Sequence, residues 1–572
     1  MKRAVLAAAL LLFAAGYVFL QTISTAPRLP AVMPGGASLC LEAPEFGRLV
    51  RDWDGSKVKA DWLASANYGA FSRSNLFSKL HDVYGEYGQA AGFLPDLKSL
   101  IEIAGTDSAL ALYGIRDVEF LYVSRIPAAD LMKSRLWALR GKFETRQAEG
   151  ASFYLRTDPA SKRTVAFAFV DGCLLLATGD DLVAQALELI AGGGKPSIAS
   201  DRWYRDAAAT RSEEGELRLT MNLESLARSV YVRSYWVQRN VSEMRRYRAG
   251  IADVKRTGGD IVESRVFLRA QAPGEVSPPQ PDPIVPALLA LVPPEAGLYK
   301  AWRTGEPSET AVLIARKLIG VQPGPTPDWR DAPAASEPDN AGDEGDLETR
   351  IDEQPLPADP GTSGCLAAIR AMLEKGGARA ILLVQSSSPA GAAAFVETPS
   401  VVVLDGAADW DADLVRQSLA SAAQNLWTTS RLGAGWAPGT AGRHAVERLD
   451  GLGILLFASS GKLLFLANDS GLLAAVLDRA GTKPQAGDGG VTYAAGFRHL
   501  RERSSYQRIM AALDFTSSAG SGWAAGSEGA PRFFSENIAS LSRVLSGVEE
   551  VRIAEEDKGD RTVQTVVYRL TH

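Results

Sequence analysis

Two stretches of the chain decide the fold: DGCLLLATGD at residues 171–180 and SGKLLFLAND at residues 460–469. Each places a glycine between two apolar runs, and a two-residue turn at that point predicts a tight β-hairpin. Apolar residues at helical spacing follow in both, so a helix is expected after each hairpin. Asp180 and Asp469 stand where a carboxylate is expected to cap the helix N-terminus. The two stretches therefore predict one hairpin-plus-helix unit used twice.

The likeness extends outward from both hairpins. The matching segments are, in chain order, 33–40 with 292–299, 97–104 with 366–374, 120–123 with 401–404, 127–139 with 411–426, and 261–269 with 562–570. They read in turn as a proline-led strand, a helix, a strand, a helix and a closing strand. Hairpins mixed with helices predict an α+β fold, with two tandem copies of a mostly antiparallel, twisted sheet and packed helices. A parallel, doubly wound sheet is the weaker alternative.

Composition sets the expected boundaries. Residues 273–286 are too rich in proline for a helix or an interior strand and are expected to form a linker. Residues 321–363 carry eleven acidic residues against two arginines, with almost no aromatics, so a disordered acidic insertion is expected there. The first domain is then 31–272 and the second 287–572. The insertion falls where the first domain has a helical region at 58–93.

The N-terminus predicts a membrane anchor. Lys2 and Arg3 precede an uncharged apolar run from Ala4 to Leu20. A helix of about 20 apolar residues crosses a bilayer, and basic residues before it place the N-terminus in the cytoplasm. Residues 1–23 are thus expected to be a retained signal anchor in the inner membrane, with the bulk of the chain extracytoplasmic. The alternative is a cleaved signal peptide, which Pro27 disfavours.

The basic-then-apolar start, the proline-led first strand and the duplicated hairpin-plus-helix resemble those of uncharacterised, exported, membrane-anchored bacterial proteins that carry a duplicated domain of unknown function. The resemblance spans most of residues 34–570. It implies a location in the cell envelope, and it brings no catalytic residues to this chain.

No motif with recognisable chemistry appears in the sequence. Gly192-Gly193-Gly194-Lys195 lacks the spacing of a phosphate-binding loop and is expected to end a helix. The chain has four histidines and three cysteines at wide spacing, so neither a metal nor a cofactor is expected. Ser527 lacks the strand that a nucleophile elbow needs, and the acids of 339–346 fail the calcium-loop pattern. Cys40 and Cys173 read as buried strand residues, and whether they pair is left open.

Arginines and aromatics interleave between Tyr231 and Arg248, which makes this the candidate contact surface. The residues are Arg233, Trp236, Arg239, Arg245, Arg246 and Arg248. Such a surface suits anionic lipid head groups or a protein partner, whereas the extracytoplasmic location excludes nucleic acid. The alternative is a long amphipathic helix whose arginines lie in solvent.

Three functions remain open. The favoured one is a non-enzymatic, membrane-anchored protein that binds envelope partners or organises the envelope. The second is a carrier of a lipid-like hydrophobic ligand held between helices and sheet. The third, an enzyme built on scattered carboxylates such as Asp171, Asp180 or Asp469, ranks last because these positions are more simply turns and caps.

Overall fold

The structure is a computed structural model. It describes residues 28–115, 117–210, 215–229, 244–270, 282–304, 306–320, 360–386, 398–427, 435–451, 453–481, 490–503 and 545–571. The expected anchor at 1–23 lies outside these ranges, and within them no helix is both long and apolar enough to cross a membrane. The chain divides into two compact units. Unit 1 comprises Met1–Pro278 with Lys558–Thr565, and unit 2 comprises Pro279–Asp557 with Val566–His572.

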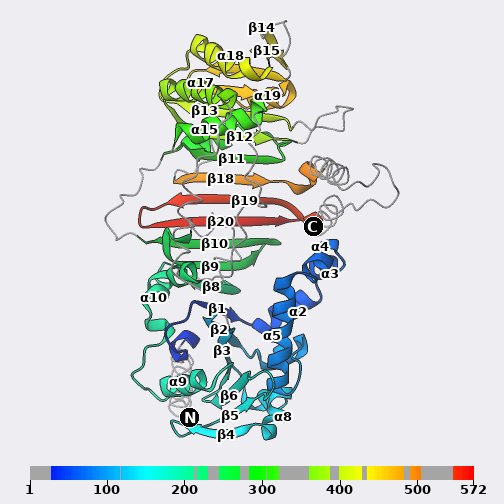
Figure 1. Ribbon diagram of the computed structural model, residues 1–572, viewed down its shortest axis with the longest axis vertical. Helices are drawn as coiled ribbons and strands as arrows, with labels where there is room; N and C mark the ends of the chain where they lie inside the picture. The colour runs from blue at the N-terminus through cyan, green and yellow to red at the C-terminus, as the bar shows by residue number, and fades with distance from the viewer. Residues whose placement is uncertain are drawn as a thin grey trace, which may run out of the picture. The chain divides into compact units, whose positions relative to one another are not determined.

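The strands of unit 1 form an antiparallel sheet (Figure 1). They are β1 (Leu39–Pro44), β2 (Asp107–Gly114), β3 (Glu119–Arg125), β4 (Glu144–Ala148), β5 (Ala151–Thr157), β6 (Thr164–Val170), β7 (Cys173–Ala177), β8 (Leu217–Asn222), β9 (Tyr247–Thr257) and β10 (Asp260–Arg269). Their order is β4-β5-β6-β7-β3-β2-β1-β8-β9-β10, with every neighbouring pair antiparallel.

The strands of unit 2 pair in the same order. They are β11 (Leu298–Arg303), β12 (Ala378–Gln385), β13 (Ser400–Gly406), β14 (Trp436–Ala441), β15 (His444–Asp450), β16 (Ile454–Ser460), β17 (Leu463–Ala467), β18 (Val491–Phe497), β19 (Val548–Asp557) and β20 (Arg561–Leu570). The division between the units falls within β20, whose residues up to Thr565 belong to unit 1 and whose residues from Val566 belong to unit 2. The order is β14-β15-β16-β17-β13-β12-β11-β18-β19-β20. The expected α+β class with antiparallel sheet is confirmed.

The registers of the two units also correspond. One row of cross-strand neighbours in unit 1 runs Phe167, Leu176, Tyr122, Leu110, Leu41. The row at the same strand positions in unit 2 runs Phe457, Leu466, Val402, Leu383, Lys300. Because side chains alternate between the faces of a sheet, each row points to one face. The two rows differ most at their last position, where Leu41 is replaced by Lys300.

The hairpins are present, but the matching of 171–180 with 460–469 is wrong by one residue. The turns are Asp171-Gly172 and Gly461-Lys462, because Val170 pairs with Cys173 and Ser460 with Leu463. Asp171 and Gly172 both have positive φ, whereas in the second turn Gly461 alone does. These are the patterns of type I′ and type II′ turns, which need glycine at different positions. Aligning the two glycines therefore shifted the sequence match.

The cap prediction is right in one unit and wrong in the other. Asp469 caps α19 (Ser470–Leu477), and its Oδ1 accepts a hydrogen bond from Leu472 N at 2.7 Å. In unit 1 the cap residue of α9 (Asp180–Ile190) is Gly179, and Asp180 is the first helical residue. The same one-residue shift explains the difference, since Gly179 rather than Asp180 occupies the position of Asp469.

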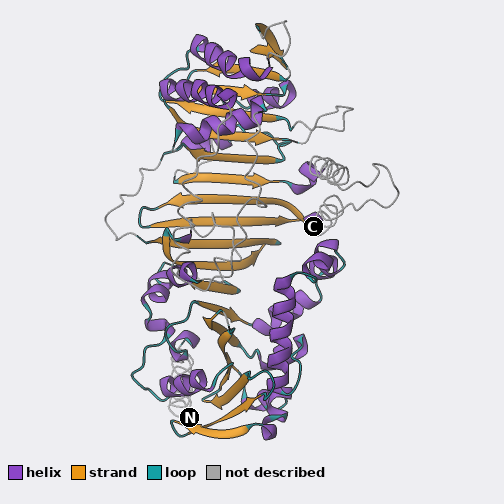
Figure 2. Cartoon of the chain, in the orientation of Figure 1, coloured by secondary structure: helices purple, strands orange, loops and turns teal. Residues whose placement is uncertain are grey.

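Helices cover both faces of the sheet in unit 1 (Figure 2). They are η1 (Leu29–Val32), α2 (Phe46–Asp54), α3 (Lys57–Leu63), α4 (Ala66–Phe71), α5 (Asn75–Ala91), α6 (Leu97–Ile103), α7 (Ala128–Leu131), α8 (Arg135–Ala138), η2 (Arg140–Lys142), α9, η3 (Ile198–Ser200), α10 (Arg202–Ala208) and α11 (Leu223–Arg228). Side chains of η1, α9 and α10 join one core cluster, and those of α5 to α8 join another. The single helix expected over 127–139 is two short ones, α7 and α8.

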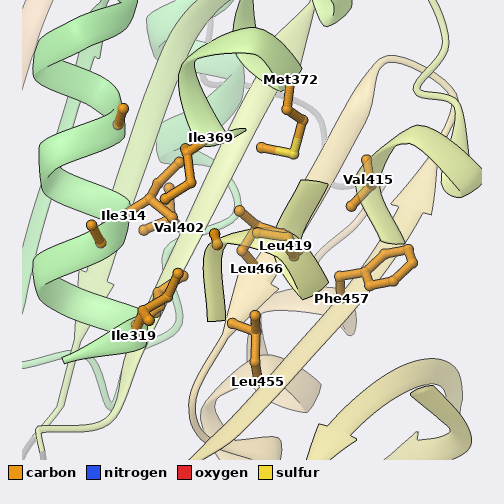
Figure 3. Close-up of a cluster of buried hydrophobic side chains, with 14 of the residues drawn as sticks. Ile314, Ile319, Ile369, Met372, Val402, Val415, Leu419, Leu455, Phe457 and Leu466 are labelled. Carbon is orange, nitrogen blue, oxygen red and sulfur yellow. The ribbon is translucent and has the colours of Figure 1, made fainter. Parts of the chain in front are cut away.

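Unit 2 packs other helices on the face that α5 to α8 cover in unit 1. Its helices are α14 (Ile284–Leu289), α15 (Pro307–Ile314), the π-helical turn η4 (Ala315–Ile319), α17 (Pro360–Gly376), α18 (Ala412–Trp427), α19 and η5 (Leu545–Gly547). Ile369, Met372 and Leu419 from α17 and α18 fill this face against the strands (Figure 3). Two expected boundaries are wrong by a few residues, because α14 begins inside the linker and α17 begins at Pro360. Residues 321–359 of the expected acidic insertion lie outside the described residues.

Candidate functional site

A cavity of about 290 Å³ lies within unit 1 between the sheet and the helices of residues 46–103. Its floor is the row described above, with Leu41, Leu110 and Leu176 at the surface of the cavity. Its roof comes from α5 and α6, which contribute Tyr87 and Leu100. The three floor leucines are partly buried rather than fully buried, because helices stand over them without filling the space.

The polar groups of the cavity wall are bonded to their own neighbours. The Ser108 hydroxyl donates to Ala104 O at 2.6 Å and lies 2.8 Å from the Tyr122 hydroxyl. Thr178 Oγ1 accepts from Phe120 N at 2.9 Å. Burial raises the pKa of Tyr122, so its phenol stays neutral. Because these polar atoms already have hydrogen-bond partners, the surface that the wall offers to a ligand is apolar.

The roof owes its shape to the turn between α5 and α6. Gly92 ends α5 with φ of 80°, and Phe93 N donates to Gly88 O at 3.0 Å, which closes the helix and reverses the chain. Asp96 then caps α6 by accepting from Ser99 N at 2.8 Å. Hydrogen bonds from the Ser99 hydroxyl and backbone lower the pKa of Asp96. The sequence thus fixes Phe93 and Pro95 at the wall of the cavity.

Arg156 of β5 ties the end of α5 to the sheet. Its Nη1 donates to the carbonyls of Gln89 at 3.0 Å and Ala90 at 3.1 Å. These carbonyls belong to the last turn of the helix, where the usual amide partners four residues on are missing, although Gln89 O also accepts from Gly92 N at 3.1 Å. The positive charge of Arg156 is also attracted to the negative, C-terminal end of the helix dipole. Arg156 therefore holds the roof helix at a fixed place over the floor.

The cavity meets an apolar surface at the α5–α6 turn. Leu100 lines the cavity and is 36% exposed, and Leu94 beside it is 52% exposed. Further exposed large apolar side chains lie on the preceding helices. They are Trp53, Val58, Leu63, Phe71, Leu80 and Tyr84. Neither α3 nor α4 has a buried residue. Exposed apolar groups gathered on successive helices are typical of surfaces that contact a partner, a membrane or a ligand.

The arginine-aromatic surface expected at 231–248 is only partly described. Arg233, Trp236 and Arg239 lie outside the described residues. Arg245 and Arg246 are exposed in the turn before β9, and Arg248 lies within β9. A helix continuing to Arg248 is therefore wrong, since the chain is already extended at Tyr247.

Arg248 has a structural partner. Its Nη1 donates to Asp206 Oδ2 of α10 at 2.7 Å. Burial opposes ionisation of Asp206, but Arg248 and the neighbouring Arg205 and Arg202 keep the pKa of that carboxyl below its usual value. This pair joins α10 to β9, so Arg248 is better explained by packing within unit 1 than by contact with a partner.

The structure does not bring the candidate carboxylates together. Asp171 is exposed in its turn, and Asp180 pairs with Arg146 at 2.7 Å. Asp469 is a helix cap in the other unit. Within the described ranges no group of three or more His, Cys, Asp or Glu side chains is placed to hold a metal ion. Ser527 and residues 339–346 lie outside those ranges.

Other sequence interpretations can be checked directly. Gly192 has φ of 85° after α9, and Gly193 N donates to Glu188 O at 2.8 Å, so the glycine run does end a helix. Cys40, Cys173 and Cys365 are all buried and free. The strand positions expected for Cys40 and Cys173 are confirmed.

Comparisons with known proteins add little. No family model matches the chain, and no curated protein matches it. Among solved structures, crystal form IV of TP0453 is similar at 10% identity, covering 43% of this chain and 82% of that chain with a TM-score of 0.26. Crystal form I of TP0453 gives 11% identity over 44% and 81% of the two chains, with a TM-score of 0.25. Scores this low carry no argument about fold or function.

The cavity residues could not be named from the sequence. The carrier interpretation anticipated a space between helices and sheet but no lining residue. The signal was weak because the wall draws on β1, β2, β3, β6 and β7 and on α2, α5, α6 and α8, which lie far apart along the chain. The local signal was a helix that ends at a glycine and is followed by Phe93-Leu94-Pro95. This pattern indicates a turn, but it does not indicate that the turn lines a cavity.

Proposed function

We propose that this protein binds a lipid-like hydrophobic ligand in the cavity of unit 1 and acts without catalysis of its own. The observation that carries this proposal is a carbon-lined cavity of about 290 Å³ whose polar wall atoms are already hydrogen-bonded. An apolar cavity of about 150 Å³ is known to stay dry and to bind benzene, so about twice that volume accommodates a larger apolar group.

The energetics favour an alkyl chain. Each methylene removed from water contributes about 0.8 kcal/mol, so about eight methylenes contribute about 6 kcal/mol before the entropy of binding is subtracted. A polar or charged ligand would instead lose its hydration without gaining partners from Leu41, Leu110 or Leu176. The apolar wall therefore favours a ligand whose alkyl chain has no hydrogen-bonding groups along its length.

Two features of the proposal concern the whole chain. We propose that the units are tandem copies, which their identical strand order and corresponding registers support. We also propose that residues 1–23 anchor the protein in the inner membrane with both units outside the cytoplasm, as Lys2, Arg3 and the apolar run indicate. An anchored carrier stays beside the lipid it would take up.

Binding of an envelope partner is a second candidate function. The exposed apolar side chains on α2 to α5 favour it, with Trp53 at 47% and Leu80 at 51% exposure. Such side chains covered by a partner would leave water, which stabilises an interface. The two functions are compatible, because none of the exposed apolar side chains on α2 to α5 lines the cavity.

Filling the cavity tests the carrier proposal. Leu176→Trp adds an indole over the floor and is expected to exclude the ligand. Full-length wild-type and variant chains are purified from membranes in parallel, and co-purifying acyl lipid is quantified by mass spectrometry per mole of protein. The wild-type chain is expected to carry about one lipid more than the variant, as one cavity of this size holds one ligand.

Leu63→Trp is the matched control, because it makes the same change at an exposed site of α3. It is expected to retain lipid like the wild type, since lipid around the anchor is common to all three preparations. Equal lipid in all three would refute the carrier proposal, provided that thermal unfolding shows Leu176→Trp to be folded.

A further inference from the structure

Unit 2 has a pocket of about 460 Å³ at the strand positions that floor the cavity of unit 1. Lys300 of β11 pairs with Leu383 of β12, as Leu41 of β1 pairs with Leu110 of β2. Lys300 and Leu383 line the pocket of unit 2, and Leu41 and Leu110 line the cavity of unit 1. Leu41 and Lys300 occupy the same position in the two sheets, but Leu41 presents an apolar side chain and Lys300 an ammonium group.

A second lysine faces the same pocket. Lys317 of η4 lines it, and its Nζ donates to Gln385 Oε1 at 3.3 Å. Gln385 is buried and is itself oriented by donating to Ser400 Oγ at 3.0 Å. The backbone carbonyl of Lys317 accepts from Asn468 Nδ2 at 3.4 Å. Hydrogen bonds therefore position both the ammonium group and the backbone carbonyl of Lys317.

These cations lack a counter-ion within the described part of the chain. None of Lys300, Lys317 and the adjacent Arg316 forms an ion pair with a described carboxylate, and no described acidic residue lines the pocket. Partial withdrawal from water, together with Arg316 and Lys300, lowers the pKa of Lys317. Glu555 lies beside Tyr493 across β18 and β19, outside the lining. Within the described residues, these positive charges therefore have no carboxylate partner.

Lys317 also lies on an unusual piece of helix. Residues Ala315–Ile319 form a π-helical turn directly after α15. Such turns are rare and occur often at functional sites, because the extra residue redirects the side chains that follow. Ile314 and Leu318 on either side are buried, so the core fixes the turn that presents Lys317.

The remainder of the wall is apolar. Leu298, Trp302 and Leu313 line the pocket together with Leu383 and Tyr493. An anion alone would leave this surface in contact with water, whereas an apolar ligand alone would bring no negative charge to the two exposed ammonium groups. A ligand that satisfies both carries a negative head on an apolar body.

We propose that the pocket of unit 2 binds an amphiphilic anion, a carboxylate or phosphate joined to an apolar group. The head lies between Lys300 and Lys317, and the body lies against Trp302 and its apolar neighbours. This site is separate from the cavity of unit 1 and stands on different residues, so it holds or fails independently of the carrier proposal.

Photolabelling of the full-length chain, reconstituted in phosphatidylcholine nanodiscs, tests this proposal. The probes are diazirine derivatives of octyl phosphate, octanoate and octanol, and labelled peptides are mapped by mass spectrometry. The two anionic probes are expected to label the peptides around Lys300 and Lys317 at least tenfold more than the neutral octanol probe. Stronger labelling by the phosphate identifies a lipid phosphate as the ligand class, and stronger labelling by octanoate identifies a fatty acid.

Lys300→Gln with Lys317→Gln removes both charges with little change in size and is expected to reduce anionic labelling at least tenfold. Lys375→Gln, at an exposed site of α17, is the matched control and should label like the wild type. Undiminished labelling of a folded double variant would overturn the proposal. So would equal labelling by octanol, or competition by inorganic phosphate as effective as that by octyl phosphate, which would show that the apolar body is not recognised.

Discussion

Three thiols lie in the cores of the two units, and burial governs their reactivity. It raises the pKa of Cys40 well above the usual value, raises that of Cys173, and raises that of Cys365 to about 11. Because the thiolate is the nucleophile, a maleimide reagent at neutral pH is expected to modify the native protein very slowly. In denaturant, three thiols are expected to react. One reactive thiol would instead mean that Cys40 and Cys173 are bridged.

Residue-level prediction from the sequence succeeded where the cause is local. Asp469 caps its helix because a carboxylate directly before the first helical residue meets the free amides of the first turn. Asp180 fails for an equally local reason, because an Asp-Gly turn and a Gly-Lys turn place glycine differently. Matching the sequences aligns Gly172 with Gly461, whereas matching the paired strands on either side of each turn aligns Gly172 with Lys462.

The same turns give a test at the scale of the hairpin. Gly172 adopts φ of 75°, so Gly172→Ala forces a side chain into the left-handed region and should cost about 1 kcal/mol. Amide exchange of the β6–β7 hairpin is then expected to accelerate about fivefold. Lys462 occupies the corresponding place without positive φ, so Lys462→Ala should leave exchange of β16–β17 unchanged. Equal effects of the two substitutions would contradict the assignment of different turns.

The helices of unit 1 should differ strongly in stability. No side chain of α3 or α4 is buried, whereas α9 buries Val183, Ala186 and Leu187. Elements with few buried contacts open at low free-energy cost. Hydrogen exchange in the full-length chain is therefore expected to be much faster in α3 and α4 than in α9. Protection of α3 and α4 equal to that of α9 would show that something covers their exposed side chains.

At the scale of elements, strands and helices were predictable because apolar periodicity records which face is buried. The cavity was not, because it arises from what α5 and α6 leave unfilled above β1, β2 and β7. In unit 2, α17 and α18 fill this face over Val402, Phe457 and Leu466 and leave a pocket at Lys300 and Leu383. The apolar pattern of α17 and α18 alone does not distinguish them from helices that roof a cavity. Cavities depend on long-range packing, which periodicity does not encode.

For the whole molecule, one strand order occurs in both units, but the side chains that line the cavity of unit 1 and the pocket of unit 2 differ. Unit 1 has Leu41 over an apolar cavity, and unit 2 has Lys300 beside Lys317 in a cationic pocket. The duplicated order of elements was visible in the sequence, whereas this divergence appears only when strand register shows that Leu41 and Lys300 correspond. We infer that this one position sets the ligand class of each unit.

Exchange of the two residues tests that claim most directly. Full-length Leu41→Lys and Lys300→Leu chains are photolabelled with the neutral octanol probe and the octyl phosphate probe, and labelled peptides are mapped in each unit. Leu41→Lys should lose neutral labelling in unit 1, while the control Leu41→Met keeps it. Lys300→Leu should lose anionic labelling in unit 2. Unchanged labelling of both folded variants would contradict the claim.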